Sequence, residues 1–229
     1  MLLTATACLL GFANGMRHAL EPDHLAAVST LVAGERSAKA SVRYAAAWGA
    51  GHAAMLVLAG GALALLRAKM TDGISDALEL IVAVILVALG VRGLGLALRS
   101  GRGGESFDHA HGELSHAHAG ARDHVHVSKW TVARLPFVIG LVHGLAGSGA
   151  LAALVASHVA SPAFAVGFIS VYAVGAAAGM ATLAGVLGWP LARLARSKRA
   201  VPILVGLSAA ASLVVGIAWA APILFRLAS

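Results

Sequence analysis

The chain has 229 residues, of which 59% are hydrophobic and 12% are charged, and its mean hydropathy is +0.84. An ordinary soluble domain is about one quarter charged, so this composition excludes a typical water-soluble fold and a largely disordered chain. Its 27 glycines favour membrane helices that pack closely. In such a chain the net charge of +7 reports membrane topology, and we expect no nucleic-acid partner. The single cysteine, Cys8, excludes an internal disulfide.

Six apolar segments are long enough to cross about 30 Å of hydrocarbon. They are residues 2–33, 44–67, 76–99, 131–157, 162–190 and 200–226. We therefore predict an all-α membrane protein with six transmembrane helices. The N-terminus lacks the basic region of a signal peptide, so we expect the first segment to be retained.

The two halves of the chain resemble each other. Residues 15–20 align with residues 140–145 at an offset of 125 positions, and residues 48–51 fall near residues 172–175. Because each half has three spans, the second half enters from the opposite side, which predicts a 3+3 inverted repeat. Chance similarity between helices rich in Gly and Ala is the alternative. The expected parts are a first membrane repeat, a polar loop and a second membrane repeat, at residues 1–99, 100–129 and 130–229.

Basic residues concentrate in three segments, residues 34–43, 92–134 and 193–199. Cytoplasmic loops of membrane proteins carry an excess of Lys and Arg. We therefore expect a multi-pass protein of the cell membrane, with both termini outside and the polar loop in the cytoplasm.

The first span contains a cluster of ionisable residues, RHALEPDH, at residues 17–24. Such groups are costly inside a bilayer unless they face protein, water or a partner, so the cluster predicts a functional site. His18, Asp23 and His24 offer nitrogen and oxygen ligands that suit divalent ions such as Ni²⁺, Co²⁺ or Zn²⁺.

Pro22 bears on the geometry of this cluster. On an unbroken helix the three ligands would point about 100° to 140° apart and could not close on one ion. Proline lacks an amide hydrogen and clashes with the carbonyl four residues earlier, which belongs to His18. We expect a helix break that frees this carbonyl and brings the ligands together. The alternative is a water-facing kink in which Arg17 pairs with Glu21.

HALEPDH, residues 18–24, resembles the HX4DH signature of the nickel/cobalt transporter family. WGAGHAAML, residues 48–56, is similar to the family's second motif, a Gly-His pair in the next helix, and this resemblance adds His52 to the metal site. The acidic motifs of the family's second half have no counterpart in residues 140–151 or 175–185. With six expected spans, the chain looks like the shorter branch of urease-accessory nickel permeases.

His143 occupies the position in the second half that corresponds to His18. It can be either a metal ligand or a hydrogen-bonded packing residue. Ser148 falls at the repeat position of Asp23 and is a weak ligand. Asn14 lies one turn before His18, and we expect it to hydrogen-bond between helices; the alternative is that it faces the same cavity as His18.

The polar loop contains three His-x-His pairs: His109, His111, His116, His118, His124 and His126. Flexible His-rich tracts bind metal weakly at many sites, so we expect local capture of Ni²⁺ or Zn²⁺. A solvated linker is the alternative.

These features predict a secondary transporter of Ni²⁺, with Co²⁺ as the alternative ion, because the chain has no Walker A pattern that would couple ATP hydrolysis. The resemblance implies uptake; efflux is the alternative, since related exporters share the short motif and a His-rich loop. His18 and Asp23 also match the H-x4-D pattern of a membrane acyltransferase, but the chain lacks the polar domain that such an enzyme needs. We expect no enzymatic activity and no catalytic cofactor. The expected partners are a divalent transition-metal ion and the lipid bilayer; a cytoplasmic metallochaperone and a homo-oligomer stay open.

Overall fold

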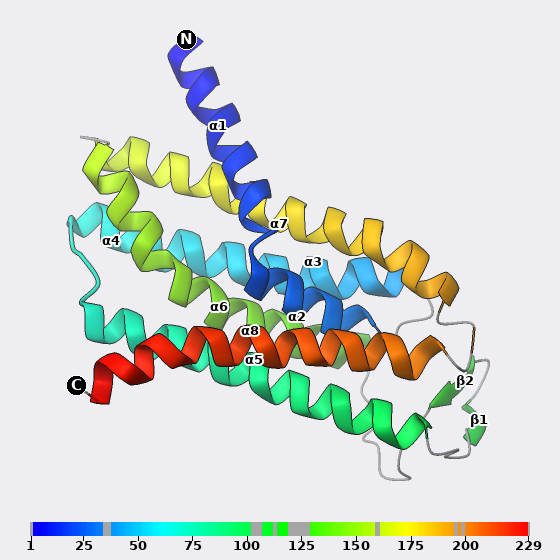
Figure 1. Cartoon of the computed structure of the whole chain (residues 1–229). Coiled ribbons are helices and arrows are strands. Elements are labelled where there is room, and N and C mark those ends of the chain that lie inside the picture. The colour runs from blue at the N-terminus through cyan, green and yellow to red at the C-terminus, as the bar shows by residue number, and fades with distance from the viewer. Residues whose placement is uncertain are drawn as a thin grey trace.

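The computed structural model describes residues 2–33, 38–101, 107–111, 114–118, 129–158, 161–194, 197 and 200–228. These residues form a bundle of α-helices with one β-hairpin at its end (Figure 1). The helices are α1 (Leu2–His18), α2 (Pro22–Val32), α3 (Ala38–Met55), α4 (Gly61–Leu66), α5 (Asp72–Gly101), α6 (Lys129–His158), α7 (Pro162–Leu194) and α8 (Ala200–Ala228). A π-helical segment, η1 (Leu56–Gly60), joins α3 to α4.

Four helices in the described part of the chain are long and apolar enough to cross a bilayer. They cover Ala38–Leu66, Asp72–Arg99, Pro162–Leu191 and Ala200–Ala228. The other two expected segments, 2–33 and 131–157, are helical as well, the first as α1 and α2 and the second within α6. Many large apolar side chains on the outside of the bundle are exposed, as lipid-facing residues are. The chain is a multi-pass membrane protein.

The polar segment 100–129 is not an irregular loop throughout, which corrects our expectation. Helix α5 continues to Gly101, and β1 (Phe107–His111) pairs antiparallel with β2 (Leu114–His118). Both strands alternate His with a smaller residue, which matches the period of two in a strand. His109, His111, His116 and His118 belong to the hairpin, whereas His124 and His126 lie outside the described residues.

The helices pack in three main pairs: α1 against α7, α3 against α6, and α5 against α8, with α3 also along α7. Helix α2 contacts α3, α5, α7 and α8, so it lies inside the bundle. Its neighbour α1 leans away from the common direction of the other helices (Figure 1).

Two glycines bring helix backbones into contact at related positions. A Cβ atom on Gly15 of α1 would overlap the carbonyl oxygen of Tyr172 in α7. A Cβ atom on Gly140 of α6 would overlap the carbonyl oxygen of Trp48 in α3. Gly140 follows Gly15 by 125 positions, and Tyr172 follows Trp48 by 124. Each contact therefore has a counterpart in the other half of the chain.

The same correspondence holds for a second pair of contacts. Gly51 of α3 lies against the carbonyl oxygen of Phe137 in α6, and Gly175 of α7 lies against that of Phe12 in α1. The offsets are again 124 and 125 positions. Small residues allow such close approach of membrane helices.

Helix α2 is tied to α8 by hydroxyl groups. The Thr30 hydroxyl lies 2.7 Å from that of Ser212 and donates to the carbonyl oxygen of Ser208 at 3.1 Å. The Ser212 hydroxyl donates to the carbonyl oxygen of Ala26 at 3.2 Å. These bonds fix the helix that carries Asp23 and His24.

Candidate metal centre

The centre is built around the break between α1 and α2. Helix α1 ends at His18, and α2 begins at Pro22. The residue before Pro22 is Glu21, which adopts an extended backbone with φ −64° and ψ 147°. A proline disfavours helical backbone in the residue before it and is well tolerated at the first position of a helix. The chain therefore changes direction between His18 on one helix and Asp23 and His24 on the next.

The carbonyl group of His18 is not freed by this break, contrary to our expectation. Its oxygen accepts a hydrogen bond from the amide of Glu21 at 3.0 Å, and the carbonyl oxygen of Arg17 accepts one from the amide of Leu20 at 2.9 Å. Bonds of this tighter type satisfy the last carbonyls of a helix. The side chains of the break, and not this carbonyl, are its unsatisfied polar groups.

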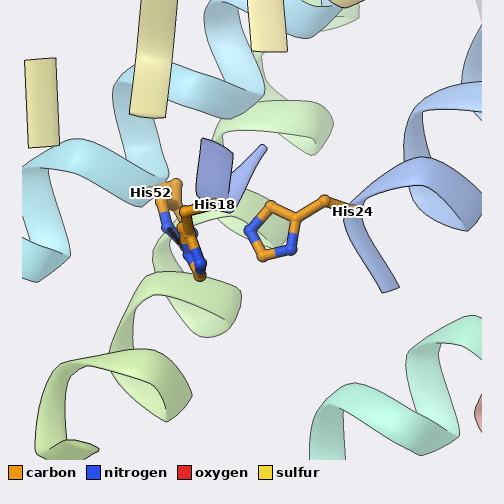
Figure 2. A group of neighbouring side chains, drawn as sticks. All are labelled: His18, His24 and His52. Carbon is orange, nitrogen blue, oxygen red and sulfur yellow. Dashed lines mark hydrogen bonds between the residues drawn. The ribbon is translucent and has the colours of Figure 1, made fainter. Parts of the chain in front are cut away.

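Three imidazole rings from three helices meet beside the break. The Nε2 atoms of His18 and His52 lie 3.2 Å apart. The His24 ring centroid is 4.4 Å from that of His18 and 5.0 Å from that of His52. Figure 2 shows the His18 and His52 rings close together and the His24 ring extending toward them from α2. One ligand nitrogen from each ring falls within 4.8 Å of the other two, so the three can hold one ion.

A second group shares His24 with the first. The Asp23 carboxylate lies 2.7 Å from Nε2 of His143 and 3.0 Å from Nδ1 of His24. The ligand atoms of Asp23, His24 and His143 also lie within 4.8 Å of one another. His143 reaches the group from the unbroken helix α6, so the centre joins both halves of the chain.

The centre is buried and incompletely paired. His24, His52 and His143 are at most 3% exposed, and Asp23 is 7% exposed. Within the described residues, Nε2 of His24 and Nδ1 of His52 have no hydrogen-bond partner, and Nδ1 of His24 meets Asp23 without hydrogen-bond geometry. Buried polar atoms are normally satisfied, so unpaired nitrogens of this kind indicate a ligand that these groups bind.

A cavity of about 140 Å³ adjoins these side chains. Besides the five expected residues it is lined by Glu21, Glu79, Val82, Ala146, Gly147 and Trp219. Trp48 packs against the cluster: it is fully buried, and its ring centroid lies 5.3 Å from that of His24 and 5.5 Å from that of His143.

Glu21, Asn14 and Ser148 make contacts that differ in part from those expected from the sequence. Glu21 pairs with His18, its Oε2 atom 3.0 Å from Nδ1, and not with Arg17. The Asn14 amide donates to the carbonyl oxygen of Leu10 in its own helix, so the expected bond between helices is wrong. Ser148 is buried and donates within α6 to the carbonyl oxygen of Leu145.

Sequence reasoning missed Glu79 and Trp219. Glu79 is a carboxylate within the apolar segment 76–99, three residues after Asp76, so the rule that drew attention to residues 17–24 applied to it too. For Trp219 the sequence holds no comparable signal. The π-helical segment after His52 was also not predicted, although such segments occur often beside functional sites.

The chain is 32% identical over 196 residues to the urease accessory protein UreH of Bacillus sp. (strain TB-90). The alignment covers 83% of this chain and 79% of the relative. No family model matches the chain, and no solved structure matches it.

Proposed function

The chain belongs to the family of urease accessory protein UreH, and we propose that it is a secondary transporter that carries Ni²⁺ across the cell membrane. The observation that carries the proposal is the buried cluster of His18, Asp23, His24, His52 and His143. Its donors are neutral imidazole nitrogens and one carboxylate, a mixture that suits Ni²⁺, with Co²⁺ as a second substrate.

The ion would be held by two overlapping groups. His18, His24 and His52 offer three nitrogens, whereas Asp23, His24 and His143 offer one oxygen and two nitrogens. His24 belongs to both groups, so one ion can exchange neighbours without leaving it. Such an exchange suits transport, which requires binding that is specific but also reversible.

The transport fold would be a six-span, 3+3 inverted repeat. The four glycine-to-carbonyl contacts support it, because each has a counterpart at the same offset in the other half. Transporters with such repeats place their ion sites at broken helices between the two halves. The break between α1 and α2 suits this role.

Uptake is the direction we propose, with both termini outside and residues 100–129 in the cytoplasm. There His109, His111, His116, His118, His124 and His126 would bind arriving metal weakly, and a cytoplasmic metallochaperone would accept it. Single-cysteine labelling tests this orientation, since residue 115 should react from the cytoplasmic side and residue 72 from outside.

The contacts of the cluster favour transport over the acyltransferase alternative. An H-x4-D enzyme needs Asp23 to orient His18 as a base. Asp23 contacts His24 and His143 instead, while the neighbours of His18 are Glu21 and His52.

Purified protein in liposomes tests the function directly. Ni²⁺, Co²⁺, Zn²⁺ and Mg²⁺ are supplied separately under an imposed membrane potential and a pH gradient. We expect Ni²⁺ to enter, His52→Ala to abolish its entry, and His158→Ala, a histidine at the end of α6, to leave it unchanged. Efflux would appear as transport only from the loop side. Movement of none of the four ions would reject the proposal.

A further inference from the structure

The cavity beside the metal cluster reaches toward one end of the bundle. Glu79 lies seven residues after the start of α5, and Trp219 lies nine residues before the end of α8. At this end Arg226 of α8 binds Asp76 of α5 at 2.5 Å. The β-hairpin follows the opposite end of α5 (Figure 1). The cavity therefore extends toward the end of the bundle opposite the hairpin.

His18 lies between the exposed Glu21 and the buried His52. Its Nδ1 atom lies 3.0 Å from the Glu21 carboxylate, and its Nε2 atom lies 3.2 Å from His52. Side-chain exposure falls from 48% at Glu21 to 12% at His18 and 2% at His24. These residues form a row from the surface of the bundle to the buried nitrogens.

Glu79 adds a second carboxylate to the outer part. It is partly buried, and its interaction within the described chain is a long hydrogen bond from the Ser75 hydroxyl at 3.4 Å. The nearby cation Arg226 is already bound to Asp76. Glu79 thus brings a second negative charge to the cavity wall. Arg226 interacts with this charge electrostatically but forms its ion pair with Asp76.

We propose that Glu21 and Glu79 form an outer site that captures a hydrated divalent cation before His18 passes it to the buried cluster. The inference rests on the proposed transport of a divalent ion. Carboxylates bind hydrated cations without removing all their water, and charge in a narrow cleft speeds their arrival. His24 lines the same cavity, and its buried Nε2 atom has no hydrogen-bond partner among the described residues, so we take this residue as the ion's next ligand.

The two sites differ in their ligand atoms, and this difference should affect which ions each site binds. Oxygen ligands accept Mg²⁺ as well as Ni²⁺ or Co²⁺, whereas imidazole nitrogens favour the transition metals. Mg²⁺ should therefore occupy the outer site but not the inner one. It should slow the arrival of a transition metal without displacing it at equilibrium.

Co²⁺ absorbance on purified protein follows loading of the inner site. In the wild type we expect millimolar Mg²⁺ to slow Co²⁺ association and leave its final occupancy unchanged. Glu79→Gln and Glu21→Gln should each slow association by about tenfold and remove the effect of Mg²⁺, with occupancy at saturating Co²⁺ retained. Asp72→Asn is the matched control, because it removes the same charge from an exposed residue at the same end of α5.

The outcomes separate this inference from the proposed function. If the wild type binds Co²⁺ at a rate that Mg²⁺ does not affect, the outer site is rejected while transport stands; this measurement requires no variant. Equal slowing by Asp72→Asn and Glu79→Gln would also reject it, since it would show only general surface charge. If Co²⁺ does not bind, the same measurement is made with Ni²⁺. A wild type that binds neither ion would reject both the outer site and the proposed function.

Discussion

Two segments at corresponding positions in the halves of the chain fold differently. The first breaks into α1 and α2 across residues 19–21, whereas α6 runs without interruption from Lys129 to His158. At the offset of 125 positions, Pro22 corresponds to Gly147 and Asp23 to Ser148. The broken segment brings four ionisable side chains to the cavity, and α6 brings only His143.

The contrast teaches that a proline alone does not break a membrane helix. α6, α7 and α8 continue through Pro136, Pro190 and Pro222. Neighbouring groups can satisfy the carbonyls that such a proline leaves unbonded. At Pro22 the preceding residue is extended, and the polar side chains on both sides turn into a shared cavity. The helix therefore breaks where polar residues flank the proline, as they do around Pro22.

The partner of each polar side chain differs in the same way. Ser148 satisfies its hydroxyl inside α6, whereas Asp23 reaches across to His143 on another helix. Because the two segments differ in this way, the halves share one candidate metal centre. An exact repeat would give two such centres.

Removing the residue shared by both ligand groups should have the largest effect. We expect His24→Ala to weaken Ni²⁺ binding by at least about 100-fold, about 2.7 kcal/mol, because both groups lose a nitrogen. Isothermal titration checks this, with His158→Ala as a control of equal chemistry outside the cluster. A change below about threefold would mean that His24 is not a ligand.

Making the broken segment resemble α6 should have the next largest effect. Pro22→Ala restores an amide hydrogen and lets the helix rewind, which turns His18 away from Asp23 and His24. We expect Ni²⁺ affinity to fall about 30-fold while the thermal midpoint stays equal or rises. Unchanged affinity would show that the site does not depend on the break.

Removing His143, the ligand that α6 contributes, should reduce Ni²⁺ affinity less than the two changes above. We expect His143→Ala to lower Ni²⁺ affinity about tenfold, because His18, His24 and His52 remain. His143→Gln retains a hydrogen bond to Asp23 and separates lost ligation from lost pairing of that carboxylate. Retention of full affinity in His143→Ala would leave His143 a packing residue.

The smallest effect is expected at the proline of the unbroken helix. Pro136→Ala should change Ni²⁺ affinity by less than about twofold, since α6 is helical on both sides of residue 136. Comparing it with Pro22→Ala in one titration series isolates the geometry of the break. Similar losses in both variants would remove the distinction drawn between the two segments.

Much of this arrangement was accessible from the sequence. Long apolar runs predicted the helices, and charged residues inside the first run led to His18, Asp23 and His24, which do lie together. These residues could be predicted because ionisable side chains inside a membrane segment are rare and mark functional sites.

What the sequence did not predict depends on neighbours far along the chain or on weak local preference. Glu79 reaches the cavity only because α5 packs beside α2. The hairpin β1–β2 arises in a segment of low hydrophobicity, and η1 lies within an apolar run that would suit an ordinary helix equally well. The bond from Glu21 to the His18 carbonyl depends on the backbone angles of one turn.

The close glycine contacts limit how the bundle can move. In α5 and α8 a Cβ atom on Gly90 would lie 2.8 Å from the Ala209 carbonyl oxygen, and one on Gly216 would lie 2.9 Å from that of Ala83. With the contacts between α1 and α7 and between α3 and α6, all three helix pairs are joined backbone to backbone. Interlocked surfaces of this kind resist sliding, so each pair should move as one stiff body.

Helix α3 also packs along α7, where a Cβ atom on Gly49 would lie 3.1 Å from the Cα atom of Ala177, so the pairs α1–α7 and α3–α6 should move together. The cavity is lined by residues of all three pairs. His52 and His143 both belong to the pair α3–α6, so their separation is fixed by that pair. Glu79 and Trp219 belong to the pair α5–α8, and His18 to α1–α7. A small rotation of the pair α5–α8 against the other two pairs would therefore widen or narrow the cavity while the distance between His52 and His143 stays constant.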